Sequence, residues 1–178
     1  MIYLNNAATS WPKPSSVCEA VQACLMDTPA SQFRGGSEIL KKDTEERCRE
    51  KLGKLLGIHA RDRIFFTSGA TESLNTVLCG LDYGEEGCGI LATQTEHNSV
   101  LRPLMNQPVL KKHPVTIISC LENGAVTRKA LEKGLEEALE NTGKNPSALI
   151  VNHCSNVTGY VQDLSLIHIS EPTRLALI

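Results

Sequence analysis

The sequence lacks the features that mark several classes of protein. Only 4% of the residues are aromatic, and the net charge is −2, which gives no electrostatic reason to expect nucleic acid or an anionic membrane as a partner. No apolar stretch approaches the roughly 20 residues that span a bilayer. The first ten residues also lack the basic start and apolar core of a signal peptide. We therefore expect a cytoplasmic protein that binds small molecules, with no nucleic acid and no membrane partner.

Two further motifs are absent. The seven cysteines form no Cys-x-x-Cys pair and are odd in number, which argues against a zinc site and a disulfide framework and favours free, mostly buried thiols. No Gly-x-x-x-x-Gly-Lys-Ser/Thr loop occurs, which argues against a nucleotide P-loop.

The chain is organised around a loop between a strand pattern and a helix pattern. Residues 64–66 are an apolar run typical of a buried strand, whereas apolar residues within 74–81 recur at helical spacing. Between them, Ser68 and Gly69 indicate a tight loop and a helix N-terminus, whose backbone N–H groups and dipole suit a phosphate. The alternative is that the loop only starts a helix, and Glu72 in the first turn would repel an anion.

Strands and helices alternate along the rest of the chain. Further strands are predicted at 90–93, 115–120 and 148–152. Helices are predicted after Ser15, across 41–56, after 95–99 and across 131–139. This alternation predicts one α/β domain with mainly parallel strands.

Polar residues follow three of the predicted strands. Ser68–Thr71, His97 and Asn156 stand where ligands collect in open α/β sheets, so we expect a common rim to bring them together. A histidine at a helix start is also typical of a cap or a surface residue, and that alternative stays open. The segments 5–8 and 34–36 offer small residues and an arginine to a ligand, but they are equally typical of a turn and of a solvated side chain.

Five segments in order resemble the class V aminotransferases, which use pyridoxal 5'-phosphate (PLP), and within them the cysteine desulfurase and selenocysteine lyase branch. The segments are Tyr3–Ser10, Arg34–Gly36, Thr67–Glu72, Glu96–Pro103 and His153–Gly159. Any one is weak evidence, whereas five in the expected order are a specific match. The resemblance runs from Met1 to about Asp163. It implies part of the type I large domain of PLP-dependent transferases, with a mainly parallel sheet flanked by helices.

The resemblance also implies roles for individual residues. Ala70 and Thr71 would hold the cofactor phosphate. His97 would stack on the pyridine ring and act as a catalytic residue in proton transfer, and Asn156 would hydrogen-bond near the ring hydroxyl. The substrate-binding residues would be Asn6, Ala7, Ala8 and Arg34. Asn5 stands where the family often has Asp, so the charge of that Asp is missing here.

The implied reaction converts L-cysteine, or selenocysteine, to L-alanine. In such enzymes a lysine holds PLP as a Schiff base and the ring acts as an electron sink. A cysteine thiolate takes the substrate sulfur as a persulfide and passes it to an acceptor protein. The family implies a homodimer. Another class V enzyme such as a transaminase, or a non-catalytic cofactor-binding fragment, remains an alternative because the cysteine that defines the lyases is not visible.

Two segments of the family are missing from the chain. Neither the Asp-x-x-Gln that pairs with the ring nitrogen nor the Ser/Thr-x-His-Lys that supplies the cofactor lysine occurs. Lys111-Lys112-His113 has the reversed order, so we reject it. Residues 164–178 resemble a translated sequencing adapter and are expected to be a non-native tail, which leaves 1–163 as the N-terminal part of the class V domain. We therefore expect an inactive fragment, truncated before the cofactor lysine.

Overall fold

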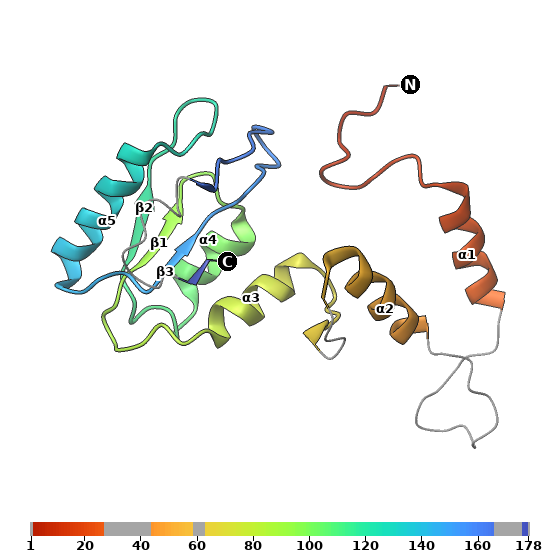
Figure 1. The fold of residues 1–178 in the computed structure, drawn as a ribbon, viewed down its shortest axis with the longest axis horizontal. Coiled ribbons are helices and arrows are strands. Elements are labelled where there is room, and N and C mark those ends of the chain that lie inside the picture. The colour runs from red at the N-terminus through yellow and green to blue at the C-terminus, as the bar shows by residue number, and fades with distance from the viewer. Residues whose placement is uncertain (1, 27–43, 59–62, 166–175, 178) are drawn as a thin grey trace, which may run out of the picture. The chain divides into compact units, whose positions relative to one another are not determined.

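The chain contains two units, Met1–Phe66 and Thr67–Ile178. The computed structural model describes residues 2–26, 44–58, 63–165, 176 and 177. The first unit contains α1 (Ser15–Met26) and α2 (Thr44–Leu56). The second contains α3 (Ala70–Gly80), β1 (Ile90–Thr93), α4 (Asn98–Asn106), β2 (Val115–Ile118), α5 (Arg128–Thr142), β3 (Ala148–Ile150) and β4 (Ala176–Leu177) (Figure 1). None of the described helices is both long and apolar enough to cross a bilayer.

The sheet of the second unit is parallel throughout, which confirms the expected strand direction. Its strand order is β2-β1-β3-β4, and Ile90 of β1 pairs with Val115 on one side and Ala148 on the other. Parallel neighbours need crossover connections, and α4 and α5 supply them. The carboxyl ends of the strands therefore share one edge. We call the segments that follow β1, β2 and β3 (94–97, 119–121 and 151–156) the carboxyl rim.

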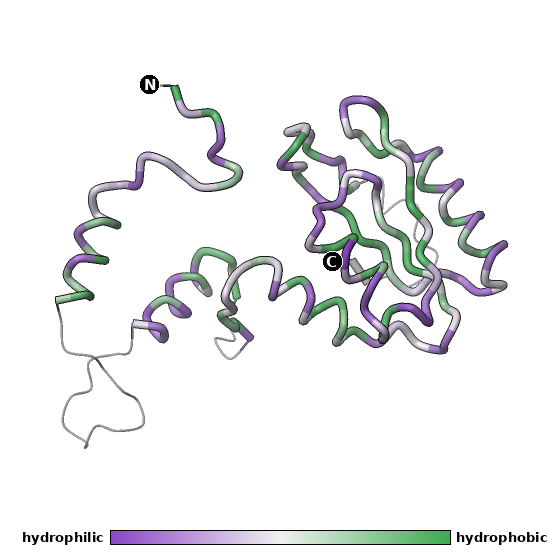
Figure 2. The backbone as a smooth tube through the Cα atoms, turned by 180° about the vertical axis from the view of Figure 1, so that it is seen from behind, coloured by the Kyte–Doolittle hydropathy of each residue, from purple (hydrophilic) through white to green (hydrophobic). Residues whose placement is uncertain are grey.

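Helices cover both faces of this sheet and bury two apolar cores. Successive strand side chains point to opposite faces, so Ile90 and Ala92 join the core beneath α3 and α4, whereas Leu91 joins the core beneath α5. In β3, Leu149 likewise lies on the α5 side. Figure 1 shows α5 on one face and α4 on the other, and Figure 2 shows hydrophobic residues concentrated along the strands. The predicted α/β architecture is thus confirmed as three layers.

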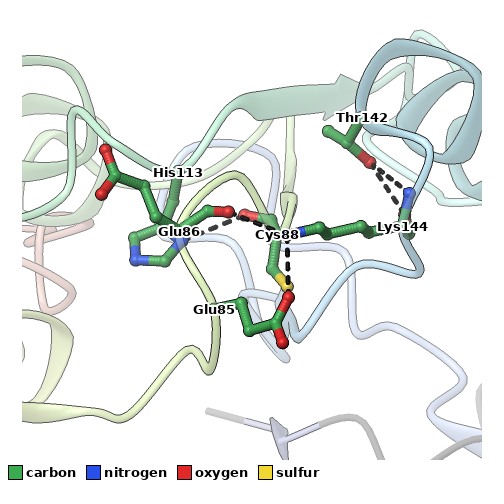
Figure 3. Close-up of polar contacts among 6 residues, drawn as sticks. All are labelled: Glu85, Glu86, Cys88, His113, Thr142 and Lys144. Carbon is green, nitrogen blue, oxygen red and sulfur yellow. Dashed lines mark hydrogen bonds and ion pairs between the residues drawn. The ribbon is translucent and has the colours of Figure 1, made fainter.

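A polar network holds the opposite edge of the sheet, where the loops before β1, β2 and β3 meet (Figure 3). Lys144 Nζ donates to Glu85 Oε2 and to the carbonyl oxygen of Glu86, both at 3.0 Å. This hydrogen bond to Glu85 raises the pKa of Lys144. His113 Nδ1 lies 3.1 Å from the carbonyl oxygen of Cys88. The amino ends of the three strands are therefore tied together away from the predicted site.

The predicted strand at residues 64–66 is wrong. The segment belongs to no helix or strand in the part of the chain that the structure describes, and 80% of Phe65 is exposed. A side chain, and not a neighbouring strand, binds its backbone: Arg49 Nε donates to the carbonyl oxygen of Ile64 at 3.0 Å. The Arg49 guanidinium also lies 5.1 Å from the Phe66 ring centroid. An apolar run becomes a strand only where a partner supplies the ladder hydrogen bonds.

The cysteines are free, as predicted, but the expectation that most are buried is wrong. Cys18, Cys24, Cys48 and Cys154 are exposed, and the other three are half-buried. Cys18 and Cys24 belong to α1, which buries no residue. A thiol cannot be buried where its helix has no apolar surface packed against it.

Candidate functional site

Ser68 and Glu72 shape the loop that enters α3. The backbone N–H and the hydroxyl of Ser68 donate to Glu72 Oε2 at 2.8 and 2.6 Å. These hydrogen bonds stabilise the carboxylate and hold the pKa of Glu72 below its usual range. The Glu72 carboxylate is therefore hydrogen-bonded to Ser68, which precedes α3.

The first turn of α3 leaves backbone donors available. Gly69 is the N-cap residue and offers no side-chain cap, and the first N–H bonded back to it is that of Ser73, at 3.1 Å from the Gly69 oxygen. Within the described residues, the N–H groups of Ala70 and Thr71 have no acceptor. Both residues are exposed. Two unpaired donors at the positive end of a helix dipole fit a phosphate group.

His97 is the N-cap residue of α4. Its Nδ1 accepts the backbone N–H of Ser99 at 3.1 Å and lies 2.8 Å from Ser99 Oγ. Because Nδ1 accepts, the proton of the neutral ring is on Nε2. The side chain is exposed and the cap fixes one ring edge, so a face of the ring is available to a flat ligand.

The structure brings Thr71 and His97 together. Both line an open hollow of about 380 Å³ between α3 and α4, which we call the α3–α4 hollow. Asn75 and Arg102 line it as well, although no pattern in the sequence indicated a role for either residue. Helical spacing would have indicated Asn75, which lies four residues after Thr71 and donates from Nδ2 to the Thr71 carbonyl at 2.8 Å. A donor-rich helix start and an imidazole thus share one concavity.

Asn156 lies outside the lining of this hollow. It is exposed in a tight hairpin after β3, closed by a bridge between Cys154 and Val161. The buried Ser155 supports the turn, because its Oγ accepts the N–H groups of Val157 and Thr158, each at 3.2 Å. The hairpin therefore presents Asn156 at the carboxyl rim, as predicted from its position after a strand.

The predicted substrate residues belong to the first unit. Asn6, Ala7 and Ala8 form an exposed turn, in which Asn6 Oδ1 accepts the backbone N–H of Trp11 at 2.9 Å. Arg34 lies outside the described residues. The roles of all four residues in substrate binding stay predictions.

Comparison with known proteins identifies the family. The family model Aminotransferase class-V matches residues 2–172. The match extends past Asp163 into the segment expected to be a non-native tail, and that expectation stays a prediction.

The chain also resembles individual relatives. It is 32% identical to the cysteine desulfurase IscS of Vibrio cholerae and to that of Aeromonas salmonicida, in each case over 93% of this chain and 40% of the relative. The apo structure of a cysteine desulfurase from Thermococcus onnurineus matches with a TM-score of 0.74 at 25% identity, over 99% of this chain and 43% of that chain. The fold of the cysteine desulfurase CsdA from Escherichia coli is also similar, with a TM-score of 0.72 at 23% identity, over 99% of this chain and 43% of that chain.

The chain thus spans 40% of the length of these two curated relatives and a similar share of the two solved structures. The family match covers nearly the whole chain, and the fold agrees with it. The chain belongs to the class V aminotransferase family.

Proposed function

We propose that the chain carries the phosphate-binding and ring-binding part of a PLP site in a cysteine desulfurase. The observation that carries this proposal is that Thr71, at the unpaired N-terminus of α3, and His97 line the same hollow. The names of the relatives favour a desulfurase over a transaminase. The substrate would be L-cysteine or selenocysteine, and the product L-alanine.

The residues present fit this cofactor. The N–H groups of Ala70 and Thr71 would hold the phosphate, and the exposed face of His97 would stack on the ring. His97 Nε2, which carries the proton of the neutral imidazole, is the atom at which this chain would move a proton. Asn156 would hydrogen-bond near the ring hydroxyl. When bound, PLP withdraws electrons from the α-carbon of an amino acid substrate.

We further propose that this chain alone does not turn over. It contains neither the Asp-x-x-Gln nor the Ser/Thr-x-His-Lys segment of the family, so it lacks the lysine that holds the cofactor covalently. The sulfur-acceptor protein, the homodimer and the cytoplasmic location belong to the same proposal for the whole enzyme. Release of sulfide from cysteine by this chain with PLP, faster than by PLP alone, would contradict the proposed inactivity.

Phosphate recognition can be tested by equilibrium dialysis with PLP and with pyridoxal, which lacks the phosphate. We expect PLP to bind more tightly than pyridoxal. The variant Ala70→Pro removes one N–H donor at the first helical position, where proline is well tolerated. It should weaken PLP binding about tenfold or more, since a hydrogen bond to a charged group contributes about 1.5–3 kcal/mol, and should leave pyridoxal binding unchanged.

The matched control is Arg128→Pro, which makes the same change at the first position of α5. It should leave PLP affinity unchanged. Equal affinity for PLP and pyridoxal in the wild-type chain would refute the phosphate site.

Assays on the whole enzyme distinguish the remaining candidates. Alanine and sulfide from cysteine support the desulfurase, and transfer of an amino group to a keto acid supports a transaminase. Cofactor binding without either reaction supports a binding fragment.

A further inference from the structure

Glu96 is a buried carboxylate for which the proposed function has no use. Its exposed fraction is 9%, and it lies at the carboxyl rim directly before His97. Its Oε1 accepts the hydroxyl of the fully buried Thr93 at 2.6 Å and the backbone N–H of Asn152 at 2.6 Å. The backbone N–H of Glu96 donates to the Thr93 carbonyl at 3.2 Å. Thr93 and Glu96 are therefore joined through both their backbones and their side chains, across one tight turn.

These hydrogen bonds compensate for the burial of the charge. Burying a carboxylate is costly unless donors satisfy it, and short bonds from N–H and O–H groups to a charged oxygen are the strong kind. No ion pair involves Glu96 in the described part of the chain. The site therefore depends on two neutral donors, the Thr93 hydroxyl from β1 and the Asn152 N–H from the segment after β3.

The bond to Asn152 joins the two rim segments that carry predicted cofactor residues. Asn152 follows β3 and precedes the hairpin that bears Asn156, whereas Glu96 is adjacent to His97. Among the residues that the structure describes, this is the only hydrogen bond between segments 94–97 and 151–156. The neighbouring rim contact, from Cys120 N–H to Gln94 Oε1 at 3.3 Å, ties β1 to β2 instead.

Strand geometry explains why a side chain makes this connection. The β1–β3 pairing ends at Ala92 and Ile150, after which β1 turns away towards α4. The N–H of the half-buried Asn152 is then left without a strand acceptor, and an N–H that water does not reach freely needs one. The Glu96 carboxylate takes that place.

We propose that Glu96 is a positioning residue of the cofactor site, which holds the His97 imidazole in place relative to the hairpin that carries Asn156. This inference rests on the proposed function for the identity of the ligand. Its structural part, that Glu96 ties the turn before His97 to the segment after β3, stands on the hydrogen bonds alone.

Three variants of the full 178-residue chain separate this role from a contribution to stability. Glu96→Ala leaves the Thr93 hydroxyl and the Asn152 N–H without an acceptor. Glu96→Gln keeps an amide oxygen that can accept both donors. Thr93→Val removes one donor with little change of shape, and it serves as the readout if Glu96→Ala does not fold. Thr142→Ala is the control, because it removes half-buried hydroxyl hydrogen bonds at the C-terminal end of α5, at the opposite edge of the sheet.

The first readout is the nitrogen NMR spectrum of the His97 ring together with the Asn152 amide proton. Glu96→Ala should shift the Nδ1 signal of His97 and move the Asn152 amide signal upfield, and Thr93→Val should do so to a smaller extent. Glu96→Gln should keep both signals close to those of the wild type, and Thr142→Ala should not affect them. Unchanged His97 signals in Glu96→Ala, or in Thr93→Val if the former is unfolded, would overturn the proposal.

The second readout is PLP affinity by equilibrium dialysis. Glu96→Ala should weaken binding about tenfold, the lower end of what loss of a supporting hydrogen bond costs at metal sites, and Glu96→Gln should restore it to within about twofold. An equal loss in Thr142→Ala would show a general effect of stability and overturn the positioning role. If the wild-type chain binds no PLP, the proposed function fails, whereas the NMR readout still decides the role of Glu96.

Discussion

His97 Nδ1 accepts the backbone N–H of Ser99 at 3.1 Å, so the imidazole that we expect to face the cofactor also caps α4. The two functions use different parts of the ring. Capping occupies the Nδ1 edge, whereas stacking and proton transfer need a ring face and Nε2. This division allows the two functions to be separated by mutation.

We predict that His97→Asn and His97→Ala differ in stability but not in cofactor binding. Asparagine is a good N-cap residue, so His97→Asn should stay within about 0.5 kcal/mol of the wild type, whereas His97→Ala should lose about 1 kcal/mol. Both variants remove the ring and should weaken PLP binding. Urea denaturation and equilibrium dialysis measure the two effects. Wild-type PLP affinity in His97→Asn would eliminate the stacking role.

Gly134 allows α5 to lie close to β2. A methyl group at this position would come 2.9 Å from Ile118 Cγ1, a methylene carbon of a buried side chain. Gly134→Ala should therefore lower the free energy of unfolding by about 1–3 kcal/mol through overpacking. The matched change Gly80→Ala, at the end of α3, meets no atom within 4 Å. It should stabilise the chain by up to about 1 kcal/mol, so equal effects of the two changes in urea denaturation would contradict the close packing.

Tyr83 should make the chain sensitive to alkaline pH. Its hydroxyl donates to the Leu78 carbonyl at 2.8 Å, and burial, with a smaller effect of Cys79, raises its pKa above the ordinary value of 10.0. The folded state holds the proton more tightly than the unfolded state. The stabilisation is therefore complete below pH 10.0 and is lost as the pH rises through the folded-state pKa.

Tyr83→Phe removes this titration. We expect it to lose about 1 kcal/mol at neutral pH because of the missing hydrogen bond, and to show a shallower decline of unfolding free energy above pH 10.0. The raised pKa of Lys144 acts in the same direction, so some decline should remain. Denaturation curves recorded across this range test the prediction, which a decline as steep as that of the wild type would rule out.

Ser68 should control the acidity of Glu72. Ser68→Ala removes the hydroxyl donor and keeps the backbone donor, so the pKa of Glu72 should rise towards its ordinary value of 4.5. A lowered pKa stabilises the fold above that value, and the stabilisation is lost as the pH falls through the folded-state pKa. The variant should therefore lose less stability on acidification. NMR titration of the Glu72 carboxyl carbon measures the change, and Ser73→Ala is the control.

Much of the fold follows from local pattern. The apolar run at 90–93 and the helical spacing after Ser68 are local signals, and the structure has β1 and α3 there. The same reasoning failed at residues 64–66, where an equally apolar run has no strand partner in the described chain. Apolar character is a property of a segment, whereas pairing depends on another segment.

Some features of the candidate site could likewise be predicted from the sequence, and others could not. Thr71 and His97 line one hollow, although only His97 follows a strand of the sheet, because residues 64–66 pair with no strand in the described chain. Nothing in the sequence indicated that Glu96 would be buried, because a glutamate at a strand end is ordinarily solvated. Only the approach of β3 brings the Asn152 N–H within 2.6 Å of its carboxylate.

The sequence by itself determined the family, the order of helices and strands from α3 to β3, and the residue types available to a phosphate and a flat ring, whereas β4 was not predicted. These properties depend on residue identity and local spacing, which the chain carries in any conformation. The tertiary structure alone decided which polar groups found partners: Glu72 with Ser68, His97 with Ser99, and Glu96 with Thr93 and Asn152. A hydrogen bond extends only about 3 Å, so the partners of these groups are settled when the fold brings donors and acceptors within that distance.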